Sequence, residues 1–329
     1  MNRLLKFDDS KALAFQRPSL TSVNEKDLST MPVYDILCGK SAGLPFEYLM
    51  TDIYSGCLPI KSICYGNCSA AEYWINKGYN FGSRHINNFD EASFRKSIEQ
   101  LSPDQRWLRQ GWVSDVSLSK KSWELLGPIS DVLMEYNIHM VIITKIFTKP
   151  SEEVMRKLAA NKTELRVSIS AIDTKHEIER RFDGLEAYRQ EGGLSVPYLM
   201  SFKYADEILR NNQELIVEKI VEDDYIGAEH PLRLSNDNLG LDSAETERHY
   251  HPKFADQTWF GRLYEEVGNF ILPPPTFLPA DYTFDFLRYS DVQKAGAQFK
   301  FNNLPTYKDL IEKNLIHNNT FDHASYDVK

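Results

Sequence analysis

The sequence predicts an α/β protein, a partial (β/α) barrel of about six parallel strands with N- and C-terminal extensions. Two observations carry this prediction. Short β-rich runs alternate with amphipathic helical stretches, which is typical of parallel strands joined by right-handed crossovers. The run 139–144 is also nearly continuously apolar, as expected of a parallel strand that is covered on both faces.

The β-rich runs and the helical stretches follow one another in strict alternation after the first run. The runs span 46–54, 111–117, 139–144, 165–170, 196–201 and 225–230, and the helical stretches span about 86–101, 122–136, 151–161, 175–191 and 206–222.

The stretch 175–191 has the strongest helical signals. Thr174 and Glu177 have the spacing of a capping box, an apolar stripe of 3.6-residue period follows them, and Gly192 stands where the helix should end. The basic pair Arg180-Arg181 within this stretch is interpreted as solvated helix charges.

Three segments follow from this pattern. Residues 1–45 are polar and irregular and are expected to form an N-terminal extension, residues 46–235 the barrel, and residues 236–329 a C-terminal extension or lid. We expect the lid to pack over the strand ends near Glu229 and His230, using Trp259, Phe260, Tyr264 and the run Pro273–Pro275.

Composition excludes several classes of protein. The chain has 47 acidic and 38 basic residues, and a formal net charge of −9 argues against a broad nucleic-acid-binding surface. The N-terminus lacks a signal-peptide core, and no stretch approaches the roughly 18 apolar residues of a transmembrane helix. Four cysteines in a chain of this size do not form a disulfide framework, so we expect reduced thiols and a cytoplasmic location.

Three of the four cysteines lie within twelve residues, directly after the first β-rich run. They are Cys57, Cys64 and Cys68, and Cys38 lies 19 residues upstream. Four thiolates close an iron–sulfur cluster, whereas three leave one iron open to a substrate or cofactor. The alternatives are a zinc site completed by His85 or another residue, or packed thiols without a metal.

Polar residues also follow the other strands, at the end of a barrel where catalytic groups gather. These residues are Ser114 and Asp115 after the second run, Thr144 and Lys145 after the third, Ser168 and Ser170 in the fourth, and Glu229 and His230 in the sixth. Each has a plainer interpretation: Asp115 as a turn or cap residue, Lys145 as a solvated charge, the serines as barrel filling, and the Glu-His pair as structural.

Over residues 46–235 these motifs resemble the radical S-adenosylmethionine superfamily, and most closely its spore photoproduct lyase-like branch. The family places a three-cysteine loop, a Ser-Asp pair, a Thr-Lys pair and a Ser-x-Ser motif in this order. The cysteine spacing here, Cys-x6-Cys-x3-Cys, departs from the usual Cys-x3-Cys-x2-Cys. The hydrogen-donating cysteine of the DNA-repair branch is also replaced, since Trp112 and Val113 precede Ser114.

The resemblance implies a [4Fe–4S] cluster on Cys57, Cys64 and Cys68, with S-adenosyl-L-methionine on its open iron. It implies that Lys145 pairs with the methionyl carboxylate, while Ser114, Asp115, Ser168 and Ser170 bind other polar parts of the cofactor. Cofactor cleavage would give a 5′-deoxyadenosyl radical that abstracts hydrogen from the substrate.

The expected enzyme modifies a small molecule or peptide in a biosynthetic pathway and takes electrons from a donor such as flavodoxin or ferredoxin. Glu229 and His230 are candidate substrate contacts. The catalytic residues themselves are not identified. The alternatives are a nucleic-acid repair or modifying enzyme of the same superfamily, and a non-catalytic zinc-binding or scaffold protein.

Overall fold

The structure is a computed structural model. It describes residues 3–12, 25–40, 49–59, 68–100, 107–111, 114–201, 204, 206–225, 227–231 and 270–271.

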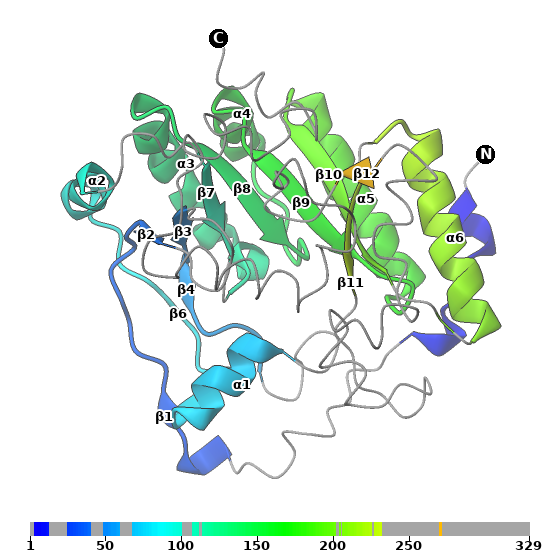
Figure 1. The fold of residues 1–329 in the computed structure, drawn as a ribbon, viewed down its shortest axis with the longest axis horizontal. Helices are drawn as coiled ribbons and strands as arrows, with labels where there is room; N and C mark the ends of the chain where they lie inside the picture. Colours follow the sequence, from blue (N-terminus) through cyan, green and yellow to red (C-terminus); the bar gives the residue numbers. More distant parts are fainter. Residues whose placement is uncertain are drawn as a thin grey trace, which may run out of the picture.

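A sheet of eight strands runs through the described residues, in the order β12-β11-β10-β9-β8-β7-β3-β2 (Figure 1). Every neighbouring pair is parallel except β2 and β3, which are antiparallel. The strands are β2 (Gly39–Lys40), β3 (Leu49–Thr51), β7 (Trp107–Gln110), β8 (His139–Thr144), β9 (Glu164–Ile169), β10 (Leu194–Ser201), β11 (Gly227–Pro231) and β12 (Phe270–Ile271).

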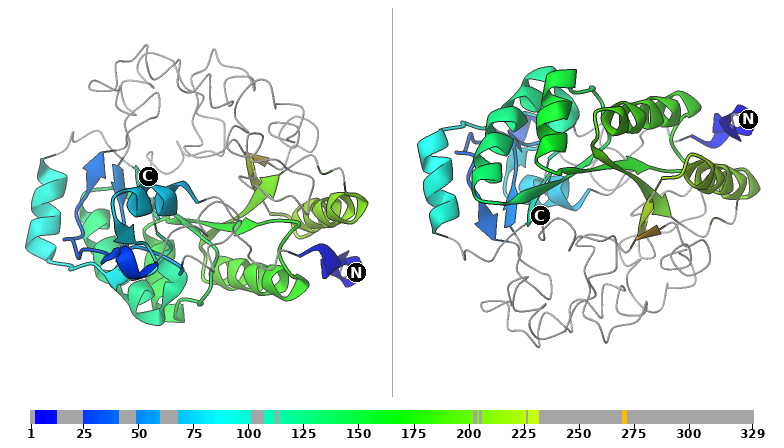
Figure 2. Two further views of the ribbon diagram at one scale, coloured as in Figure 1. Left: turned by 90° about the horizontal axis from the view of Figure 1, so that it is seen from below. Right: turned by 90° about the horizontal axis from the view of Figure 1, so that it is seen from above.

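From β3 to β12 the strand order follows the chain without a reversal. Right-handed crossovers that all advance in one direction place their helices on one face of the sheet. Figure 2 shows α3, α4 and α5 on the same face. The helices that separate the main strands are α2 (Glu91–Glu99), α3 (Lys120–Glu135), α4 (Glu152–Ala160), α5 (Lys175–Gln190) and α6 (Glu207–Glu222).

A smaller unit, built from β1 and the segment between β3 and β7, lies below the sheet in Figure 1. It contains α1 and two short strand pairs: β1 pairs in parallel with β5, and β4 pairs in antiparallel with β6. Their bounds are β1 (Ser29–Thr30), β4 (Tyr54–Ser55), α1 (Ser69–Asn76), β5 (Tyr79–Asn80) and β6 (His85–Ile86).

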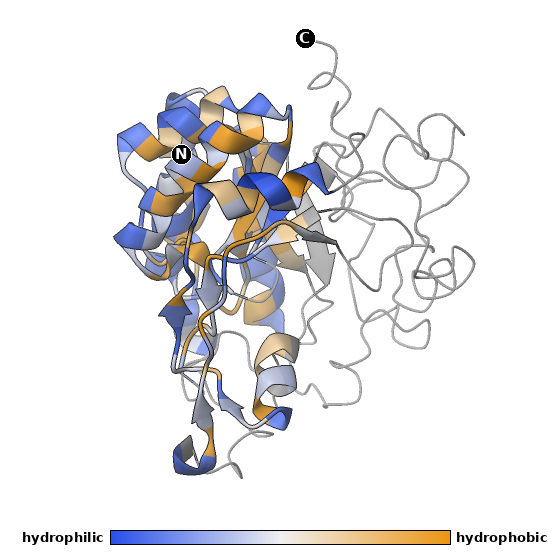
Figure 3. Ribbon diagram, turned by 90° about the vertical axis from the view of Figure 1, so that its left-hand side faces the viewer, coloured by the Kyte–Doolittle hydropathy of each residue, from blue (hydrophilic) through white to orange (hydrophobic). Residues whose placement is uncertain are grey.

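The main core lies between the sheet and these helices, and Figure 3 shows apolar and polar residues alternating along the helices. Residues of opposite parity in a strand point to opposite faces of a sheet. In β9, Leu165, Val167 and Ile169 belong to the main core, so Glu164 and Arg166 lie on the other face. We call this other face, opposite α3, α4 and α5, the second face.

The α/β class, the mainly parallel sheet and the five predicted helices are confirmed. The capping box of α5 is present, with Thr174 as its N-cap and Glu177 as its third residue. The second strand, however, was predicted wrongly at 111–117 and lies at Trp107–Gln110. Gly111 ends it with a φ of +86°, and Asp115 then caps the short 3-10 helix η5 (Val116–Leu118).

The N-terminal segment is more ordered than its polar composition suggested. The 3-10 helix η1 (Arg3–Lys6) packs against α6, and Leu4 and Phe7 are buried in the main core. Two further 3-10 helices, η2 (Asp9–Lys11) and η3 (Glu25–Asp27), lie in the same segment. From the predicted C-terminal extension the structure describes β12, which pairs with β11. Trp259, Phe260, Tyr264 and Pro273–Pro275, the residues expected to form the lid, lie outside the described residues.

Candidate functional site

The ends of the first two parallel strands are joined by a carboxylate. Asp52 directly follows β3, and its Oδ1 accepts hydrogen bonds from the Ser114 backbone N at 3.1 Å and the Ser114 Oγ at 2.8 Å. Ser114 is therefore at the strand ends, as predicted. In this structure its hydroxyl donates to Asp52.

Asp115 joins the second strand end to the third. Its Oδ1 accepts hydrogen bonds from the Ser117 N and Oγ, at 2.8 and 2.6 Å, and from the Thr144 Oγ1 at 2.6 Å. Its Oδ2 accepts from the Lys145 N at 2.7 Å. With four donors on one buried carboxylate, Asp115 fixes the backbone from which the Lys145 side chain projects.

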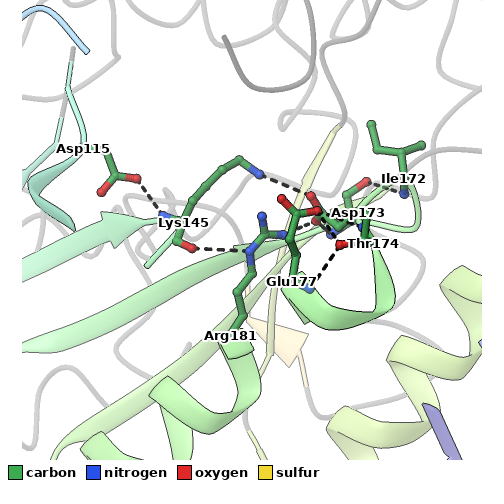
Figure 4. Close-up of polar contacts among 8 residues, drawn as sticks. Asp115, Lys145, Ile172, Asp173, Thr174, Glu177 and Arg181 are labelled. Carbon is green, nitrogen blue, oxygen red and sulfur yellow. Dashed lines mark hydrogen bonds and ion pairs between the residues drawn. The ribbon is translucent and has the colours of Figure 1, made fainter. Parts of the chain in front are cut away.

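Lys145 meets Asp173 and Arg181 above the ends of β8 and β9 (Figure 4). The Lys145 Nζ lies 4.0 Å from Asp173 Oδ1, and the Arg181 guanidinium pairs with Asp173 Oδ2. Arg181 also donates from Nε to the Lys145 carbonyl oxygen at 3.4 Å. All three side chains are buried, so one carboxylate is shared by two cationic side chains away from bulk water. Such an arrangement suits the binding of an acidic group beside Lys145.

Asp173 is held in place by the start of α5. Its Oδ2 accepts a hydrogen bond from the Ser170 backbone N at 2.7 Å, and the neighbouring Thr174 caps the helix. Arg181 comes from the second turn of the same helix, on the buried side with Ile178 and Leu185. Arg181 is 1% exposed, which corrects the interpretation of the Arg180-Arg181 pair as solvated charges.

The two predicted serines of the fourth strand have different surroundings. Ser168 lies in β9 opposite Tyr198 of β10 and is 8% exposed, whereas Ser170 follows β9 and is fully buried. Ser170 accepts a hydrogen bond from the Ile172 N at 3.4 Å and contacts the Tyr204 hydroxyl. Burial raises the pKa of the Tyr204 phenol.

Two of the three clustered cysteines are described. Cys57 and Cys68 both pack, partly exposed, against one small apolar cluster that contains Met31, Ala71, Ile75 and Phe81. Cys68 is the N-cap residue of α1 without a side-chain capping bond. Cys64 lies in the segment 60–67, outside the described residues.

Cys38 has a different environment. It is 7% exposed within the main core, and burial raises the pKa of its thiol to about 12. A thiol with such a pKa is a poor source of the thiolate that binds metals. Cys38 is therefore a small buried residue of the main core.

Glu229 and His230 lie in β11, where they pair in register with Leu199 and Met200 of β10. This places their backbone at the carboxyl end of the sheet, on the far side of β10 from Lys145. Their side chains lie outside the described parts, so a role in substrate binding stays a prediction.

Sequence reasoning assigned no role to four residues of the strand-end network: Asp52, Asp173, Arg181 and Tyr204. Asp52 was hidden inside the predicted first strand. Arg181 did carry a signal, because it follows Ile178 by three residues and precedes Leu185 by four, the spacing of a shared helix face.

Among the described residues, which do not include Cys64, no three His, Cys, Asp or Glu side chains form a group that could hold a metal. In the same residues no helix is both long and apolar enough to cross a membrane. No protein-family model matches the chain, and no curated protein matches it significantly.

Proposed function

We propose that this protein is a radical S-adenosylmethionine enzyme with a single [4Fe–4S] cluster, which acts on a small-molecule or peptide substrate. The observation that carries the proposal is the joined set of polar residues at the ends of consecutive parallel strands. Hydrogen bonds and ion pairs connect Asp52, Ser114, Asp115, Lys145 and Asp173 across the ends of β3, β7, β8 and β9. Chemistry on a parallel α/β sheet is typically located at this end of its strands.

A partial (β/α) barrel is the finer fold that we propose. Sequential strand order and helices on one face are the features that separate a barrel-like sheet from a doubly wound one, in which helices cover both faces. Both features support the proposal here.

The chemistry of the donors fits an iron–sulfur cluster. Cys57 and Cys68 are partly exposed, and they lie at the two ends of the segment that contains Cys64. Soft thiolate ligands favour iron–sulfur clusters and zinc over hard cations. Three thiolates would leave one iron open, and the reduced cluster would supply the electron that cleaves S-adenosylmethionine.

The residues near Lys145 fit the acidic end of that cofactor. Asp115 holds the Lys145 backbone, and the Lys145 Nζ lies 4.0 Å from Asp173 Oδ1. At this place the ammonium would pair with the methionyl carboxylate. Ser168 and Ser170 remain candidates for other polar atoms of the cofactor. Asp115 already accepts four hydrogen bonds from the protein, so its contribution would be to position Lys145.

A cluster-reconstitution experiment tests the cysteine ligands. Anaerobic reconstitution of the full chain should give about four irons per chain. Alanine at Cys57, Cys64 or Cys68 should abolish the cluster, whereas Cys38→Ala should retain it. A colourless protein that binds one zinc would instead support the non-catalytic alternative.

Cofactor binding is tested next on the reconstituted protein. With dithionite and S-adenosylmethionine it should release 5′-deoxyadenosine. Lys145→Ala should keep its iron but bind S-adenosylmethionine at least tenfold more weakly, since a charge-assisted hydrogen bond contributes about 1.5–3 kcal/mol. Lys120→Ala, a change at the exposed start of α3, is the matched control. Equal binding by both variants would remove Lys145 from the cofactor site.

A further inference from the structure

A buried arginine lies on the second face of the sheet, in the middle of β9. Arg166 is 1% exposed, and its Nε pairs with the Glu164 carboxylate two residues earlier in the strand. Its Nη1 is also buried and has no hydrogen-bond partner among the described residues. A guanidinium is always charged, and a buried donor without an acceptor is costly. The Arg166 Nη1 is therefore a buried donor that an additional acceptor would satisfy.

The surroundings of Arg166 are apolar on both sides. Ile143 of β8 and Val196 of β10 are its register neighbours, and they belong to one small apolar cluster with Tyr198. The Arg166 Cζ lies 5.9 Å from the centre of the Tyr198 ring. Charge–charge attraction is much stronger in such surroundings than in water. An acidic group that reached the Nη1 would be held firmly.

Glu164, the ion-pair partner of Arg166, is fully buried as well. Burial raises the pKa of Glu164, and the opposing effect of Arg166 is smaller.

Ser168 continues the row of polar residues formed by Glu164 and Arg166 on this face of β9, toward the strand ends. It lies two residues beyond Arg166 on the same face of β9 and, at 8%, is more exposed than Arg166. Its hydroxyl can donate to the same acidic group. Ile143 pairs with Arg166 and Thr144 with Val167, so the Lys145 backbone lies two residues beyond Arg166 along the sheet, about 7 Å at about 3.3 Å per residue. A small molecule anchored at Arg166 can therefore extend to Lys145.

We propose that Arg166 and Ser168 bind the carboxylate or phosphate group of a small anionic substrate on the second face, between β9 and β10. This assigns Ser168 to the substrate and leaves Ser170 as the serine that would contact the cofactor. That the bound anion is a substrate rests on the proposed function, because the inference names the chemical class on which that enzyme would act. The anion site itself requires neither the cluster nor S-adenosylmethionine.

Calorimetric titration of the full chain with inorganic phosphate and, separately, with succinate tests the site. We expect saturable binding of one anion at one site per chain, and the two titrations distinguish a phosphate from a carboxylate ligand. Ser168→Ala, which leaves the ion pair intact, should weaken this binding at least threefold. Arg189→Met, which removes a half-exposed arginine of α5, is the control and should bind like the wild type.

Arg166→Met alone would leave Glu164 buried without its cation, so the variant for this position is Glu164→Gln combined with Arg166→Met. It should bind the anion at least tenfold more weakly while its circular dichroism stays unchanged. If this double variant does not fold, Ser168→Ala decides the question. Absence of saturable binding to the wild type, or equal binding by Ser168→Ala, overturns the proposal, and so does retained binding by a folded double variant.

The same titration of Cys57→Ala keeps the two proposals apart, because this variant should lack the cluster and still bind the anion like the wild type. Anion binding that depends on Arg166, together with failure to form any cluster in the wild type, would support the anion site and reject the proposed enzyme. A cluster that forms in a wild-type protein without anion binding would do the reverse.

Discussion

Asp115 and Arg181, two charged residues at the strand ends, are both buried by contacts between segments that are distant in the sequence. Asp115 accepts from residues 29 and 30 positions ahead, and Arg181 donates to the carbonyl of a residue 36 positions earlier. The helix period indicated that Arg181 faces the sheet, but its partners depend on which strands lie next to each other.

Cys38 allows a prediction at the residue scale about pH. Burial raises its pKa to about 12, while an unfolded thiol titrates near about 8.5. The folded state therefore keeps a proton that the unfolded state loses. The stabilising contribution is complete below the unfolded pKa and is lost as pH rises toward the folded one, by at most about 1.4 kcal/mol per pH unit.

Urea unfolding of the wild type and Cys38→Ala at pH 8 and pH 10 measures this contribution. The free energy of unfolding of the wild type should fall more than that of the variant, by up to about 2 kcal/mol. Parallel pH dependences of the two proteins would contradict the assigned state of the thiol.

At the scale of elements, α5 connects local sequence signals with the site. Its capping box was predicted from Thr174 and Glu177, and the residue before it, Asp173, pairs with Lys145 and Arg181. The start of α5, which is encoded locally, thus positions the Asp173 carboxylate that Lys145 and Arg181 share.

Thr174→Ala should lower the free energy of unfolding by about 1 kcal/mol. The threonine hydroxyl accepts a hydrogen bond from the Glu177 N at 3.2 Å, and alanine removes it. Asp183→Ala, at an exposed position of the same helix, is the control and should cause no loss of stability. Chemical denaturation measures both changes. A loss of equal size in the two variants would show that the cap makes no specific contribution.

At the scale of the whole molecule, the N-terminal segment is part of the folded body. Phe7 is buried in the main core, and the backbone of Asp8 exchanges two hydrogen bonds with the Asn212 side chain of α6, at 3.1 and 2.6 Å. These contacts join residues 204 positions apart in the sequence. The first residues therefore stabilise the last described helix of the chain.

Phe7→Ala should lower the free energy of unfolding by about 3 kcal/mol, because it removes a buried aromatic side chain and leaves a cavity. Leu5→Ala is a close control, since Leu5 lies two residues away and is 66% exposed. It should change stability by less than about 0.5 kcal/mol. Similar unfolding curves for Phe7→Ala and the wild type would mean that the segment does not pack on α6 in solution.

The sequence by itself determined the features that depend on local order: the alternation of strands and helices, the five helices between the main strands, and the cap of α5. These follow from hydrophobic period and from capping chemistry within a few residues. The position of β7 was not determined in this way, because the apolar run beyond Gly111 resembles a strand while a positive φ at that glycine ends the real one.

Only the tertiary structure decided which polar residues meet. Parallel pairing brings Asp52 to Ser114, Asp115 to Thr144 and Lys145 to Asp173, from strands separated by a complete helix or more. It also encloses Arg166 between Ile143 and Val196, which turns an ordinary charge in a strand into a buried donor. The reason is physical: burial and ionic partners are properties of the assembled sheet, and a local sequence pattern does not predict them.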